Sequence, residues 1–191
     1  MYGNCEVNNE YWFGSVSSII IYDSKRDYWR TLDLSRGVPY GEIRFLEADS
    51  NFIWAASNYE IQKIDIKTKR SERTVLTKSL SNSFINSISL KNNYLWVSTE
   101  YKLLCYNINS EVIVPFNYIG NINAIKDRID VITKFYDIFF DGLKLYVATN
   151  QGIIAYNNVN STWELITEPT IYNNKFVKII YVYRNQLFIV T

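Results

Sequence analysis

The chain has 191 residues, of which 20 are Lys or Arg, 19 are Asp or Glu and none is His, so its formal net charge is +1. The missing histidine excludes Ser-His-Asp and Cys-His catalytic pairs and histidine-based metal sites. The balanced charge argues against nucleic-acid binding, which needs clustered positive charge. No apolar run approaches the roughly 20 residues of a membrane-spanning helix, and residues 1–6 lack the form of a secretory signal. Two cysteines, Cys5 and Cys105, are too few and too far apart for a zinc site, and they do not suggest a disulfide.

A short motif recurs five times along the chain. It consists of an aromatic residue, two mostly small or β-branched residues and a hydroxyl residue. The motifs begin at Trp12, Trp54, Trp96, Tyr146 and Phe188, so they lie 42, 42, 50 and 42 positions apart. Apolar runs of strand length precede the later four motifs, at residues 43–48, 85–90, 135–140 and 177–182. A period of about 42 residues that holds four short strands is typical of a β-propeller blade.

The strands can be placed in chain order. Residues 1–9 are too polar for a convincing strand, so we expect the chain to open near a second strand of a blade, at 11–15. The next period predicts strands at 43–48, 52–56, 61–66 and, as a polar outer strand, 72–76. Asp23, Asp65, Asn107 and Asn157 share one register after the motif and are expected to cap turns. The repeated Trp12, Trp54 and Trp96 are expected in the core, because packing needs them in every blade.

These patterns predict an all-β protein, a β-propeller of about four and a half four-stranded blades. The single domain would span 1–191, with blades near 1–40, 41–82, 83–130 and 131–174 and a partial blade at 175–191. The last strand, 187–191, would repeat the role of the strand at 11–15, which makes ring closure within the chain awkward. We therefore expect a segment of a larger ring of 6–8 blades, a homo-oligomer joined through open blade edges, or docking on a larger assembly.

Residues 145–157 (LYVATNQGIIAYN) and, nearly as well, 95–107 resemble the two-component-regulator propeller repeat. That repeat carries a hydrophobic-aromatic pair, a small residue and threonine, then glycine, a hydrophobic residue, tyrosine and aspartate. Only Gly152 keeps the glycine, and quinoprotein-like and kelch-type repeats share much of the pattern. The resemblance implies an extracytoplasmic, ligand-sensing module of a signalling protein. A native start at Met1 would instead imply a cytoplasmic protein, so the compartment stays open.

Two segments are candidate binding sites. The 50-residue spacing indicates an insertion within 117–130, which would offer Tyr118, Lys126 and Arg128 as a recognition loop; the alternative is a tolerated surface insertion. The segment 26–30 offers Tyr28, Trp29 and Arg30, residue types that are common at interfaces. Its alternative is an outer strand whose Tyr28 and Trp29 pack between blades, as Trp163 would at the equivalent place.

Carboxylate pairs are the remaining route to acid-base chemistry. Glu47 with Asp49, and Asp137 with Asp141, lie near predicted strand ends, but neither pair has a distinctive motif. We find no calcium loop and no phosphate-binding loop, and we predict no catalytic residues, metal or cofactor. The sequence predicts a non-catalytic recognition or scaffolding module that binds a protein partner or ligand through loops at one propeller face. The alternatives are a ligand- or saccharide-sensing domain and a carboxylate-based lyase or hydrolase.

Overall fold

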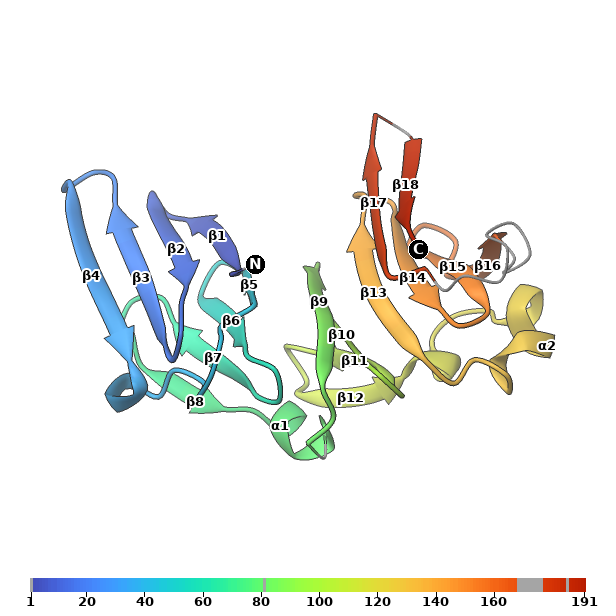
Figure 1. The fold of residues 1–191 in the computed structure, drawn as a ribbon, viewed down its shortest axis with the longest axis horizontal. Coiled ribbons are helices and arrows are strands. Elements are labelled where there is room, and N and C mark those ends of the chain that lie inside the picture. The colour runs from blue at the N-terminus through green and yellow to red at the C-terminus, as the bar shows by residue number, and fades with distance from the viewer. Residues whose placement is uncertain (1, 81, 168–176, 185) are drawn as a thin grey trace. The chain divides into compact units, whose positions relative to one another are not determined.

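The computed structural model describes residues 2–80, 82–167, 177–184 and 186–191 (Figure 1). Its strands form four antiparallel sheets of four strands each and one sheet of two strands. This all-β architecture is that of β-propeller blades, as predicted. The chain divides into two compact units, Met1–Leu90 and Lys91–Thr191. Within the described residues no helix is long and apolar enough to cross a bilayer.

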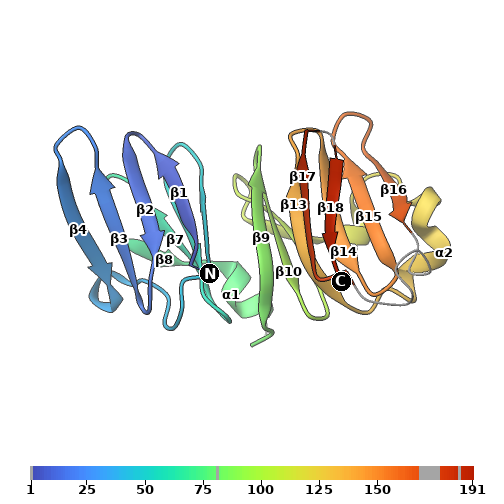
Figure 2. The same ribbon diagram turned by 45° about the horizontal axis from the view of Figure 1, so that its top comes forward.

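The first sheet has the order β1-β2-β3-β4 (Figure 2), with strands Asn4–Val7, Glu10–Gly14, Ser18–Asp23 and Tyr28–Asp33. The expectation that residues 1–9 form no strand is therefore wrong. In β1 the exposed Asn4 and Glu6 alternate with Cys5 and Val7, which pack against the core. The strand therefore has one polar face and one buried face, although its overall composition is polar. The hairpin to β2 turns at residues 8–9, two asparagines with φ of 52° and 64°.

The second sheet contains β5 (Phe45–Ala48), β6 (Phe52–Ala56), β7 (Ile61–Asp65) and β8 (Ser71–Arg73). The outer strand predicted at 72–76 is wrong in its second half, because α1 (Val75–Leu80) follows β8. Leu76 and Leu80, one helical turn apart, are both fully buried, and the Thr77 hydroxyl donates a 2.8 Å hydrogen bond to the carbonyl oxygen of Ile61. Burial of two leucines at that spacing favours the helix.

The core of the first unit lies between these two sheets. Trp12 and Ile21, neighbours across β2 and β3, pack with Ile53 and Ile64, neighbours across β6 and β7. All four side chains are almost completely buried. The packed face of the first sheet is thus the one that carries the motif tryptophan.

The repeated Asp and Asn residues cap turns, as predicted. In each case the side-chain oxygen accepts a hydrogen bond from the backbone N–H two residues later. These donors, for Asp23, Asp65, Asn107 and Asn157 in turn, are Lys25 (3.0 Å), Lys67 (2.9 Å), Asn109 (3.0 Å) and Val159 (2.9 Å). One capped turn lies between the third and fourth strand of each four-stranded sheet and gives these strand pairs the same register.

The remaining strands form three sheets. The third, in the order β12-β11-β10-β9, contains β9 (Ile85–Lys91), β10 (Tyr94–Thr99), β11 (Leu103–Asn107) and β12 (Val112–Pro115). The fourth contains β13 (Phe135–Phe140), β14 (Lys144–Thr149), β15 (Gly152–Asn157) and β16 (Thr162–Thr167), and the fifth pairs β17 (Ile179–Tyr183) with β18 (Gln186–Val190). The predicted insertion forms three short helical turns, η2 (Phe116–Tyr118), η3 (Asn123–Ile125) and α2 (Lys126–Ile129).

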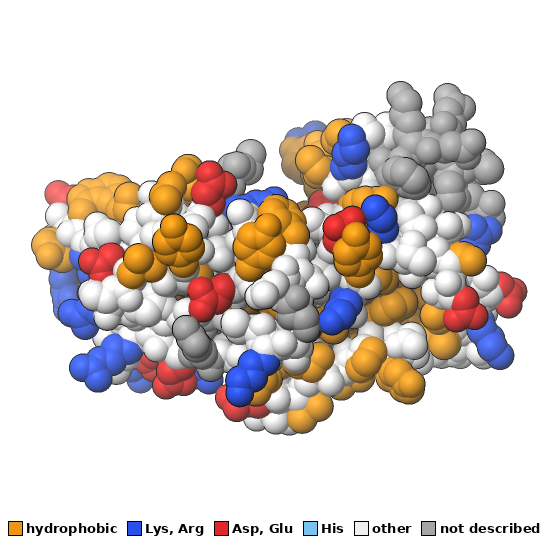
Figure 3. Space-filling view, turned by 60° about the horizontal axis from the view of Figure 1, so that its bottom comes forward, with side chains coloured by type: hydrophobic (Ala, Val, Ile, Leu, Met, Phe, Trp, Pro, Cys, Tyr) orange, Lys and Arg blue, Asp and Glu red, His pale blue; other side chains and the backbone are white. Residues whose placement is uncertain are grey.

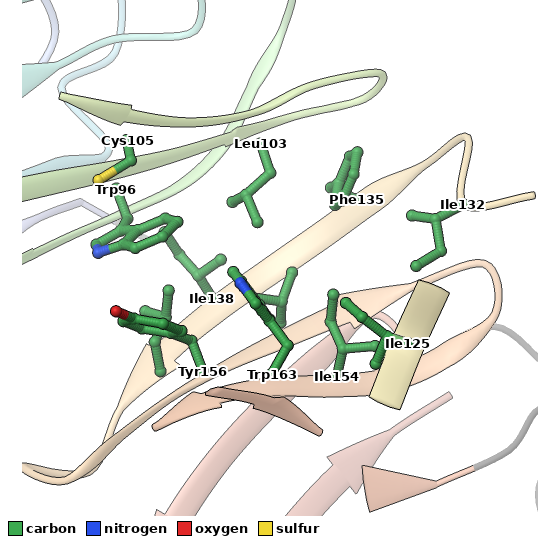
Figure 4. Close-up of a cluster of buried hydrophobic side chains, with 12 residues drawn as sticks. Trp96, Leu103, Cys105, Ile125, Ile132, Phe135, Ile138, Ile154, Tyr156 and Trp163 are labelled. Atoms are coloured by element: carbon green, nitrogen blue, oxygen red, sulfur yellow. The ribbon is translucent and has the colours of Figure 1, made fainter. Parts of the chain in front are cut away.

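Two hydrophobic clusters hold the second unit together. The larger one joins Trp96 and Cys105 to Tyr156 and Trp163 of the fourth sheet (Figure 4). It also contains Leu145 of the fourth sheet. The smaller one packs the other face of the fourth sheet against Val177 and Ile180. Trp12, Trp54 and Trp96 are 0%, 1% and 4% exposed, so the prediction that the motif tryptophans lie in the core is confirmed.

Candidate functional site

A pocket of about 260 Å³ opens in the second unit, where the third sheet, the fourth sheet and the insertion meet. Strands of the third sheet supply most of the lining, the insertion supplies two residues, and the end of β15 with the following turn supplies two more. The lining residues are Lys91, Tyr94, Trp96, Cys105, Val114, Tyr118, Ile119, Tyr156 and Asn158. The size suits a single ring-shaped group.

The inner wall of the pocket is aromatic and rigid. The rings of Trp96 and Tyr156 lie 6.0 Å apart at 45°, and both contact Trp163 (Figure 4). Trp96, Tyr156 and Cys105 are almost fully buried. Burial raises the pKa of the Cys105 thiol to about 12, so this side chain is a neutral wall and not a nucleophile at neutral pH.

The mouth of the pocket is polar and exposed. Tyr94 and Tyr118 are exposed aromatic residues, and Asn158 adds an amide. Among the described lining residues, Lys91 alone carries a formal charge; its Nζ lies 5.1 Å from the centre of the Phe140 ring. Aromatic faces beside one cation favour a flat group that bears a hydrogen-bond acceptor or a negative charge.

The insertion is clamped onto the fourth sheet. Trp163 Nε1 donates a 2.8 Å hydrogen bond to the carbonyl oxygen of Ile119. The backbone N–H of Asn121 donates a 2.7 Å hydrogen bond to the carbonyl oxygen of Ser161. Gly120 between them has a φ of 67°, and a Cβ there would lie 2.8 Å from the Tyr156 ring. The backbone therefore needs glycine at this point. These contacts hold the segment that follows Tyr118 on the fourth sheet, and Tyr118 itself lines the pocket.

The structure separates the residues predicted on the insertion. Tyr118 lines the pocket, whereas Lys126 and Arg128, on α2, are not among its lining residues. Sequence reasoning missed Lys91, Tyr94 and Asn158. These three lie at strand ends and in turns of an ordinary repeat, and the tertiary fold brings them together with Tyr118 and Ile119 of the insertion around one pocket.

The segment 26–30 is also divided. Tyr28 and Trp29 are 58% and 57% exposed, and strand alternation places Trp29 on the opposite sheet face from its neighbours. Trp29 stacks on Tyr22 at 4.6 Å, so the alternative in which Tyr28 and Trp29 are packed between blades does not describe this structure. Arg30 faces the core and forms an ion pair with Glu10, which gives it a structural role.

The carboxylate candidates mostly serve the fold. Asp49 accepts hydrogen bonds from Trp54 Nε1 at 3.0 Å and from two turn N–H groups, and Asp141 caps the turn before β14. Asp137 accepts a 3.0 Å hydrogen bond from the backbone of Ile180. In the part of the chain that the structure describes, no group of three or more Asp, Glu, Cys or His residues is placed to hold a metal ion.

Among these four carboxylates, Glu47 has a strongly raised pKa. Burial raises its pKa to about 7, although a backbone hydrogen bond from Leu90 opposes the shift. Unfolding would let Glu47 ionise near its ordinary pKa of 4.5, so the folded state loses stability as the pH rises from about 4.5 to about 7. We expect Glu47→Gln to stabilise the protein at pH 8 by about 2 kcal/mol and to leave it little changed at pH 4. Urea unfolding at the two pH values measures both, and an equal effect at pH 4 and 8 would contradict this assignment.

The surface charge is mixed. Figure 3 shows Lys and Arg side chains interspersed with acidic and hydrophobic ones on the face in view. This mixture of side chains agrees with the balanced net charge of +1.

Comparison with known proteins shows the fold. No family model matches the sequence, and no curated protein matches it. Among solved structures, the extracellular domain of a hybrid two-component system from B. thetaiotaomicron superimposes with a TM-score of 0.65 at 15% identity, over 96% of this chain and 24% of that one. The WD40 domain of Neurospora crassa Pan2 gives a TM-score of 0.58 at 12% identity, over 96% of this chain and 56% of that one.

A computationally designed protein, Ika8, has a TM-score of 0.65 at 10% identity, over 98% of this chain and 54% of that one. The likeness is one of fold. The chain thus spans about half the length of the designed and WD40 proteins and about a quarter of the two-component domain.

Proposed function

We propose that this protein is a non-catalytic recognition module that binds one ring-shaped group of its ligand in the pocket beneath Tyr118. The observation that carries the proposal is the pocket itself, in which a rigid aromatic wall, one cation and an exposed tyrosine converge. Rigid sheets hold these groups in place before the ligand arrives, so binding costs little ordering entropy. A protein partner would supply the ring as an aromatic side chain with a carboxylate nearby.

A second candidate function is a sensor of small ligands or saccharides. The exposed aromatic rings of Tyr94 and Tyr118 at the pocket mouth favour it, because sugar rings stack on such surfaces. The likeness to the two-component extracellular domain and the repeat at 145–157 also support it, and with it membership of the two-component-regulator propeller group. We do not propose a lyase or hydrolase, since Asp49 and Asp141 are engaged in turns.

The test is a titration with two probes, 3-phenylpropionate and methyl glucuronide, each of which offers one ring and one carboxylate. We expect saturable quenching of tryptophan fluorescence by at least one of them, with a Kd in about the millimolar range for so small a ligand. Binding of phenylpropionate alone supports a peptide partner, and binding of the glucuronide alone supports the sensor. Tyr118→Ala is expected to weaken binding about fivefold, the value of one aromatic contact.

Tyr40→Ala is the matched control, because Tyr40 and Tyr118 are both 77% exposed and Tyr40 lies outside the pocket. This variant should bind as the unchanged protein does. Absence of binding by both probes, or equal weakening by the two substitutions, would overturn the proposed function.

A further inference from the structure

The first sheet has an exposed aromatic face. It consists of Tyr11, Phe13, Ile20, Tyr22 and Trp29, and it lies opposite the packed face that carries Trp12. Its rings are stacked, Tyr22 on Trp29 at 4.6 Å, and Tyr11 on Tyr22 and Phe13 on Trp29 at 6.3 Å. A monomeric protein rarely exposes a contiguous apolar surface of this kind without a use for it.

The repeat identifies the equivalent face in other sheets. Tyr11, Tyr22 and Trp29 are paired across three strands, as Leu145, Tyr156 and Trp163 are in the fourth sheet. In the second sheet the corresponding pair is Ile53 and Ile64. These equivalents are buried. The aromatic face of the first sheet is thus a packing face of the repeat that is left uncovered.

The cover is the same in both buried cases. A sheet face that carries the motif tryptophan lies over it, Trp12 over Ile53 and Ile64, and Trp96 over Leu145, Tyr156 and Trp163. The internal repeat therefore defines the occupant that fits the aromatic face, a β-sheet face with the motif aromatic residue at its centre.

Among the described strands, the two-stranded sheet has such a face free. Ile180 and Ile189, paired across β17 and β18, face the fourth sheet. The opposite face presents Ile179, Tyr181, Phe188 and Val190, all exposed, with Tyr181 and Phe188 stacked at 4.7 Å. Phe188 occupies the motif position of Trp12. We call these four residues the carboxy-terminal face.

We propose that the carboxy-terminal face of one copy of this chain packs on the aromatic face of a second copy, in the same arrangement by which its own sheets pack. The contact is head to tail, because two different surfaces meet. It joins sheet faces and not the open blade edges expected from the sequence.

The experiment measures molar mass by light scattering after size exclusion, at several concentrations. We expect a multiple of 22.5 kDa for the unchanged chain. Trp29→Lys and Tyr181→Lys should each abolish the larger species, since each places a charge in an apolar contact. Tyr28→Lys, at a position equally exposed but outside the aromatic face, should leave the mass unchanged. Far-UV circular dichroism verifies that each variant is folded.

Mixing the Trp29→Lys and Tyr181→Lys variants tests whether the two different faces pair with each other. Trp29→Lys keeps an intact carboxy-terminal face and Tyr181→Lys keeps an intact aromatic face, so an equimolar mixture should associate although each variant alone is monomeric. A monomeric unchanged chain at about 100 μM, well above the Kd of a useful contact, would overturn the proposal and leave the aromatic face to another sheet. Loss of association with Trp29→Lys alone, without rescue in the mixture, would show that like faces pair and would also overturn it.

Discussion

Replacing Trp163 with alanine is expected to lower the free energy of unfolding by about 4 kcal/mol, the largest effect of any single substitution we consider. The side chain is 1% exposed, it packs against Trp96, Tyr156 and Phe116, and it donates the hydrogen bond that holds the insertion at Ile119. Alanine would leave a cavity at the centre of the larger cluster. Urea unfolding followed by far-UV circular dichroism gives the value.

Two further substitutions serve as controls for Trp163→Ala. Trp163→Phe keeps a ring but loses the Nε1–H donor, so it should cost about 1 to 2 kcal/mol. Val159→Ala, in the exposed turn before β16, should change stability by less than about 0.5 kcal/mol. If Trp163→Ala cost no more than the Val159 control, the packing described for the second unit would be wrong.

Glu10→Ala should destabilise the protein by about 3 kcal/mol, because it breaks a largely buried ion-pair cluster. The Glu10 carboxylate pairs with Lys69 Nζ at 2.6 Å and with the Arg30 guanidinium, and it accepts a 3.1 Å hydrogen bond from Trp12 Nε1. The Glu10 and Lys69 side chains are only 12% and 11% exposed. Burial lowers the pKa of Lys69, and the hydrogen bond that Lys69 Nζ donates to Glu10 opposes this shift. Removal of Glu10 therefore leaves a poorly solvated ammonium group.

The ion pair between Lys63 and the exposed Glu72 is the control. Its atoms are 3.6 Å apart and the Glu72 side chain is 70% exposed, so Glu72→Ala should cost less than about 0.5 kcal/mol. Adding Lys69→Met to Glu10→Ala should restore part of the lost stability, since a neutral side chain suits the site left behind. Equal effects of Glu10→Ala and Glu72→Ala in urea unfolding would contradict the assignment of a buried cluster.

The sequence predicts the fold well because the repeat places the same side-chain types at the same register. The motif tryptophans and the capped turns both followed from that regularity. Trp29 and Trp163 show its limit. They occupy the same repeat position, yet one is exposed and the other buried, because burial depends on which sheet lies over the face and not on the local sequence.

The two errors in the predicted secondary structure, at residues 1–9 and 72–76, have physical causes. The sequence did not predict β1, because every second side chain of this strand is polar and faces solvent, so its composition resembles that of a loop. It did not predict α1, because two leucines four residues apart fit one face of a strand as well as one face of a short helix. The pocket was predictable only in part. The spacing located the insertion and Tyr118. The contacts of Gly120 and Trp163 that hold the insertion on the fourth sheet, and the meeting of Lys91 and Asn158 in one pocket, depend on the tertiary fold.

Nuclear magnetic resonance of the five tryptophan indole N–H groups can detect a ring-shaped group that binds in the pocket beside Trp96. Addition of 3-phenylpropionate or methyl glucuronide should shift the Trp96 signal and leave those of Trp12, Trp54 and Trp29 in place, since only Trp96 lines the pocket. Tyr118→Ala should reduce that shift at equal probe concentration. No shift at Trp96 with either probe, or a larger shift at Trp29, would mean that this pocket does not bind such a group.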